Sequence, residues 1–87
     1  MRAGVAVLAL LLCAAAPPPP GASSCSGCHG GVAPVPVLAG RNAEEVAAAL
    51  DAFRAGTKQA TVMNRIAKGF SHDESVAIAA WWSEQAK

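Results

Sequence analysis

The sequence predicts a small all-α domain in which short helices surround a central group that the chain's own side chains do not supply. Apolar residues recur at helical spacing after two capping patterns, and no stretch shows the alternation of a β-strand. The chain has 87 residues, of which 53% are hydrophobic. From residue 23 onward, however, only fifteen large apolar side chains remain, too few for a self-sufficient core. The length excludes a multidomain enzyme.

Residues 1–22 are interpreted as a secretory signal peptide followed by a proline-rich lead-in. Residues 5–16 form an apolar run shorter than the roughly 20 residues that span a bilayer. Such a run is typical of a signal peptide, which would include Cys13; a buried helix or an uncleaved anchor is the alternative. The small residues 14–16 precede four prolines, 17–20. Cleavage after Ala16 would place Pro17 directly after the scissile bond, which proteases usually resist, so cleavage near Ala22 is equally expected and the site lies between residues 16 and 23. Residues 23–87 would then form one domain, exported to the periplasm.

Capping patterns place the helices of this domain. Asn42 with Glu45 three residues later is typical of a helix start, and so is Ser71 with Glu74. Glycines follow the first two apolar-spaced stretches and end them. The predicted helices cover residues 43–55, 61–68 and approximately 72–85. Residues 35–38, interrupted by a proline, are expected to form a loop.

The charge distribution argues against a nucleic-acid partner. The net charge is only +1, whereas nucleic-acid binders carry a marked basic excess. Residues 54–68 do contain four cations and no acidic residue. A solvated face is the simpler interpretation of this tract, and a docking surface for an acidic partner is the alternative.

The strongest motif lies at residues 25–29, which read C-S-G-C-H, the attachment motif of c-type haem. Cys25 and Cys28 lie one helical turn apart, so each thiol can form a thioether with one haem vinyl group. His29 then becomes the proximal iron ligand. One covalent haem c would also supply the missing central group, and the apoprotein is expected to be largely unfolded. Bacteria attach such haem outside the cytoplasm, which agrees with the predicted export.

Three other interpretations of the cysteine pair are open. It could be half of a zinc site, although His72 is the only further histidine and no third cysteine remains after residue 28. It could be a thioredoxin-like dithiol, although no βαβ pattern surrounds it. A structural disulfide across so short a loop would constrain little.

Met63 is the candidate sixth iron ligand, because it is the only thioether after Cys28. Methionine opposite histidine raises the reduction potential of a haem. A methionine at helical spacing is also common in cores, and His72 or a vacant distal position are the alternatives. No catalytic residue is predicted.

These residues resemble a small monohaem class I cytochrome c, whose P-x-L-x-G segment is similar to residues 36–40. The resemblance implies that the Pro36 carbonyl accepts a hydrogen bond from His29 Nδ1–H and that Leu38 packs on the porphyrin. Three segments are similar to the cytochrome subunit of flavocytochrome c sulfide dehydrogenase: residues 38–42, L-A-G-R-N, residues 52–56, A-F-R-A-G, and residues 60–70, A-T-V-M-N-R-I-A-K-G-F. That similarity implies an electron-transfer subunit whose partners are a flavoprotein dehydrogenase and a downstream electron acceptor.

Two departures from class I cytochromes concern the surroundings of the haem. Prolines and small residues occupy the place of the N-terminal helix, which is expected to be truncated or absent. The stretch from His29 to Pro36 is also short, so the haem would be more exposed or covered by a partner. A diffusible carrier between a dehydrogenase and a terminal oxidase is the alternative function, with only transient membrane contact through respiratory partners. A haem-based gas sensor is a third.

Overall fold

The computed structural model describes residues 17–31 and 34–86, and the regular elements within them are all helical. In chain order they are the 3-10 helix η1 (Ala22–Cys25) and the α-helices α2 (Ser26–His29), α3 (Ala43–Ala55), α4 (Met63–Ala67) and α5 (His72–Ser83). The predicted all-α class is thus confirmed for this part of the chain. The apolar run at 5–16 lies outside the described residues. Among those that are described, no helix has the length and hydrophobicity needed to cross a membrane.

The predicted caps open and close the two longest helices. Asn42 Oδ1 accepts a hydrogen bond from the Glu45 N–H at 3.0 Å, which opens α3. Gly56 ends α3 with a φ of 79°, a left-handed conformation that glycine adopts without strain. Ser71 and Glu74 form a reciprocal capping box at the start of α5.

Two helices are shorter than predicted. α4 begins at Met63 rather than at residue 61, because Val62 has a φ of −117°, outside the helical range. α5 ends at Ser83, two residues early. There the backbone N–H groups of Glu84 and Gln85 each bond the carbonyl three residues before, so the last turn tightens.

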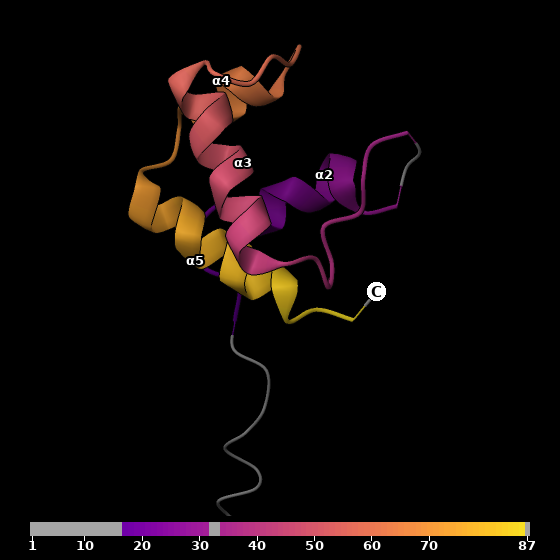
Figure 1. The fold of residues 1–87 in the computed structure, drawn as a ribbon. Helices are drawn as coiled ribbons and strands as arrows, with labels where there is room; N and C mark the ends of the chain where they lie inside the picture. Colours follow the sequence, from indigo (N-terminus) through magenta and orange to yellow (C-terminus); the bar gives the residue numbers. More distant parts are fainter. Residues whose placement is uncertain (1–16, 32–33, 87) are drawn as a thin grey trace, which may run out of the picture.

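The core lies where α3 packs against α5, with η1 beside α5 and α4 at the C-terminal end of α3 (Figure 1). Its larger buried side chains are Val46 and Leu50 from α3 and Ile78 and Trp82 from α5. The other buried apolar residues are alanines: Ala22, Ala67 and Ala79. This core is small, as the count of bulky residues predicted, and many apolar side chains are only partly buried around it.

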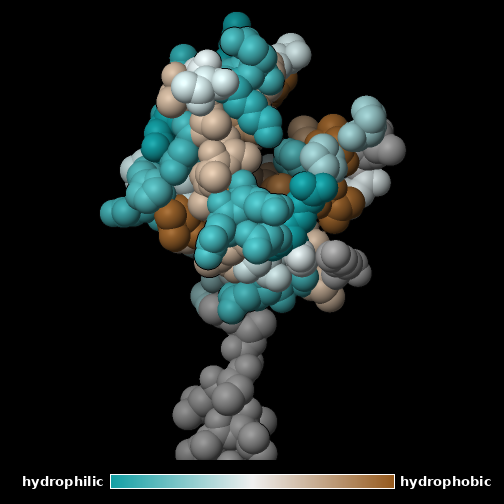
Figure 2. Space-filling model, viewed as in Figure 1, coloured by the Kyte–Doolittle hydropathy of each residue, from teal (hydrophilic) through white to brown (hydrophobic). Residues whose placement is uncertain are grey.

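Several apolar side chains are exposed to solvent. The larger ones with more than a third of their surface exposed are Val37, Val62, Ile66 and Val76. In Figure 2 the surface is notched between the lobe that contains α4 and the lobe that contains α2, and hydrophobic atoms border the notch. The fold thus leaves apolar surface uncovered, as is expected of a domain that buries only a limited share of its surface.

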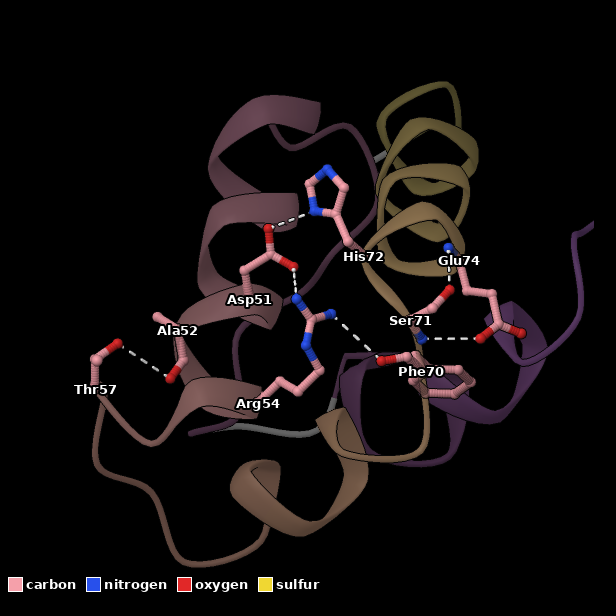
Figure 3. Close-up of polar contacts among 8 residues, drawn as sticks. All are labelled: Asp51, Ala52, Arg54, Thr57, Phe70, Ser71, His72 and Glu74. Atoms are coloured by element: carbon pink, nitrogen blue, oxygen red, sulfur yellow. Dashed lines mark hydrogen bonds and ion pairs between the residues drawn. The ribbon is translucent and has the colours of Figure 1, made fainter.

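A polar cluster joins α3 to the start of α5 (Figure 3). Asp51 Oδ1 lies 2.9 Å from Arg54 Nη2, and Arg54 Nη1 donates to the Phe70 carbonyl at 3.3 Å. The other Asp51 oxygen lies 2.8 Å from His72 Nδ1. His72, weighed above as an alternative iron ligand, is 61% exposed and faces this carboxylate. Such partly exposed pairs orient the two helices but contribute little net stability.

Within residues 17–31 the helical elements are two consecutive single turns, η1, which ends at Cys25, and α2. Residues 35–38 form a loop without strand structure, as predicted. The end of this loop is joined to α5, because the Gly40 N–H donates to the Trp82 carbonyl at 3.0 Å. The haem-motif segment and the loop therefore both lie against the same end of α5.

Ser75 provides a first test of this packing. Its side chain is fully buried, and its hydroxyl has no hydrogen-bond partner among the described residues. Because a buried unpaired hydroxyl is costly, Ser75→Ala should raise the unfolding free energy by about 1 kcal/mol in chemical denaturation. Ser75→Leu should lower it by about 1–3 kcal/mol, because the larger side chain overpacks the site. A stability loss in the alanine variant would show that the hydroxyl has a partner.

Candidate haem-attachment site

The two cysteines of the C-S-G-C-H motif lie on consecutive turns, and both are free thiols. Cys25 ends η1 and is half-buried, whereas Cys28 lies in α2 and is exposed. Burial raises the pKa of the Cys25 thiol, an effect opposed by the nearby Trp82 N–H. Between them, a Cβ on Gly27 would contact no other atom, so this side of α2 is open.

His29 is held by the loop that follows it. Its Nδ1 lies 2.6 Å from the Pro36 carbonyl oxygen. Since a carbonyl can only accept, the hydrogen must be on Nδ1, and Nε2 then presents a lone pair. This is the tautomer that a metal-ligating histidine needs, with the backbone carbonyl fixing the ring. The contact that the resemblance implied is therefore present.

Leu38 and Met63 both lie on the border of the buried core. Each is partly buried and packs against the core cluster, as Cys25 does. Met63 is the first residue of α4, which follows the loop after α3. Cys25, Leu38 and Met63 therefore border the same core cluster, and their roles toward a haem stay predictions.

The residues present fit a c-type haem. Two free thiols stand one turn apart, an oriented histidine follows directly, and apolar side chains border the same region. The alternative interpretations find no comparable support. No group of three or more His, Cys, Asp or Glu side chains suited to a metal ion occurs in residues 17–31 and 34–86. The same residues contain no strand of the kind a βαβ unit needs.

Sequence reasoning missed the residue that fixes the start of α4. Asn64 Nδ2 donates to the carbonyls of Phe53 at 3.0 Å and Lys58 at 2.8 Å. Its Oδ1 accepts from the Ala60 N–H at 2.9 Å. The sequence pattern gives no sign of this role, because the amide bonds one carbonyl in the last turn of α3 and two backbone groups of the loop that follows it.

Asn64→Ala should therefore loosen the loop that leads to Met63. Losing three hydrogen bonds, some of them part-buried, should lower the unfolding free energy by about 1–3 kcal/mol. Urea titration followed by circular dichroism measures this change. Asn42→Ala, which removes a single cap bond of α3, is the comparison and should cost about 1 kcal/mol. Equal stability of Asn64→Ala and the parent protein would show that the hydrogen bonds of Asn64 do not stabilise the loop.

The fold and the arrangement of this site define a small all-α, cytochrome c-like domain. No family model and no solved structure matches the chain. The chain is similar, at 35% identity over 68 residues, to the cytochrome subunit of sulfide dehydrogenase from Chlorobaculum tepidum. The match covers 74% of this chain and 62% of the relative, less than two thirds of its length. The similarity to such a subunit predicted from residues 38–42, 52–56 and 60–70 is thereby confirmed.

Proposed function

We propose that this chain is a periplasmic c-type cytochrome, the electron-accepting subunit of a flavoprotein sulfide dehydrogenase. The observation that carries the proposal is the C-S-G-C-H segment with His29 oriented by Pro36, in a chain similar to a cytochrome subunit of sulfide dehydrogenase. In this assignment Cys25 and Cys28 hold one haem c through thioethers, and His29 and Met63 ligate its iron. Bound haem supplies a one-electron Fe(III)/Fe(II) couple.

In this assignment the chain's own residues bind the haem, orient its histidine ligand and shield it from water. The Pro36 carbonyl accepts the Nδ1–H of His29, which fixes the ring and leaves Nε2 available to ligate iron. Leu38 provides apolar contact next to Cys25. None of these residues acts on sulfide, so substrate oxidation is assigned to the flavoprotein and the chain itself is not a catalyst. A separate acceptor takes the electrons onward.

The proposal is tested by adding sulfide to the holoprotein with its flavoprotein. The two should co-purify in fixed stoichiometry from the native host, and the haem absorption should change to the reduced spectrum when sulfide is added. The cytochrome alone should not be reduced at a comparable rate. Absence of a complex together with no sulfide-dependent reduction would overturn the assignment.

A diffusible electron carrier is the second candidate, favoured by one observation. Lys58, Arg65 and Lys68 are all exposed near the start of α4, where they could form brief electrostatic contacts. A carrier should be isolated free of flavoprotein and should exchange electrons with several partners at rates that fall steeply with added salt. A subunit should stay bound at the same salt concentrations.

A further inference from the structure

The segment directly before the haem motif is built into the fold. Ala22 is fully buried, and its carbonyl accepts a hydrogen bond from the indole N–H of Trp82 at 3.2 Å, across 60 residues of sequence. Its own N–H donates to the Pro19 carbonyl at 3.1 Å, which closes a turn. The indole N–H has no solvent to bond at this buried position, so the Ala22 carbonyl is its acceptor.

Gly21 occupies a position where any side chain would be strained. Its φ is 89°, and a Cβ placed on it would lie 2.4 Å from the Phe70 ring. Its carbonyl accepts from the Ser24 N–H at 3.2 Å and from the Ser24 hydroxyl at 2.6 Å. The Cys25 thiol also lies within 3.9 Å of that oxygen. Gly21 therefore holds the turn that positions the first cysteine of the motif.

The two residues thus belong to the domain rather than to a disposable leader. A chain beginning at Ser23 would lose the Ala22 carbonyl and leave the buried Trp82 N–H without this acceptor. It would also lose the Gly21 carbonyl, which three donors of the following turn approach. The bond after Ala15, by contrast, lies among small residues and is not followed directly by a proline, so cleavage there would leave the segment intact.

We infer that residues 19–22 form part of the mature domain and that the exported precursor is cut on the N-terminal side of Pro19. The inference rests on the proposed export. It excludes cleavage between residues 19 and 23, which the sequence alone allowed. The retained segment supplies the Gly21 carbonyl that bonds the start of η1 and the Ala22 carbonyl that bonds Trp82 of α5.

The position of the cleavage site is determined on the mature protein. The full precursor is expressed in a bacterium that matures c-type cytochromes, and the periplasmic holoprotein is analysed by intact-mass spectrometry and N-terminal sequencing. We expect a first residue before Pro19. A mature chain beginning at Ser23 would overturn the inference. A chain still beginning at Met1 would refute both the proposed cleavage and the interpretation of the apolar segment as a signal peptide. It would leave the proposed electron-transfer role untouched.

A second measurement tests the role of the segment without the native signal. Chains beginning at Ala16 and at Ser23 are exported behind an unrelated signal peptide, each with Trp82 intact and with Trp82→Phe. The Ser23 chain should give less holoprotein and a lower melting temperature. Trp82→Phe should lower the melting temperature of the Ala16 chain clearly more than that of the Ser23 chain, whose indole has already lost the Ala22 carbonyl. Equal effects of Trp82→Phe in both chains would refute the contact.

Discussion

Replacing Cys25 and Cys28 together by alanine should abolish covalently bound haem and leave most of the chain unfolded. Of the seven buried apolar residues, three are alanines. Chains of this size bury only about 60% of their unfolded surface, so they commonly need a further stabilising group. We expect no haem-stained band on a denaturing gel and a loss of most helical circular dichroism at 222 nm.

The third cysteine of the chain provides the matched control. Cys13 lies in the predicted signal peptide, so Cys13→Ala should give the same haem staining and the same spectrum as the parent protein. Haem that stays covalently bound in the double variant would refute the assignment of the motif. Retained helix without haem would instead refute the idea that the haem completes the core.

Replacing Met63 by leucine should remove the sixth iron ligand while keeping apolar bulk at the border of the core. The expected results are loss of the methionine-to-iron charge-transfer band in the oxidised spectrum and a fall in reduction potential. Axial ligands set haem potentials over a range of about 0.8 V, so the fall should be easy to measure by redox titration. The physical reason is that a thioether sulfur stabilises the reduced iron.

Two variants distinguish ligation from packing. His72→Ala should leave the band unchanged, since His72 is exposed and lies against Asp51. Met63→Ala should lose the band as the leucine variant does, but should also unfold at a lower temperature, because it leaves a cavity. A band that survives Met63→Leu would assign the sixth position to another group.

The parts of the structure that the sequence predicts well are those decided by neighbours along the chain. The Asn42 and Ser71 caps each bond a backbone N–H three residues away, and a glycine ends α3. These interactions are visible in the order of residues, because a capping side chain and its partner share one helical turn. The cysteine pair and His29 are likewise a local motif.

The long-range contacts were not predictable from such patterns. Asn64 bonds the backbone of a preceding loop, and Trp82 reaches Ala22 across 60 residues. Alanine, serine and asparagine carry no periodic signal that distinguishes a buried role from a solvent-exposed one. The bond between His29 and Pro36 was expected only because residues 36–40 resemble a known segment.

The sequence by itself determined the helical class, the three main helices and the residues available to hold a haem. All of these depend on side chains within a few positions of one another. Only the tertiary structure decided that Pro36 orients His29, that Asn64 fixes the loop before Met63, and that Trp82 bonds the Ala22 carbonyl. Those outcomes depend on which distant backbone groups need hydrogen-bond partners once α3 and α5 have packed together.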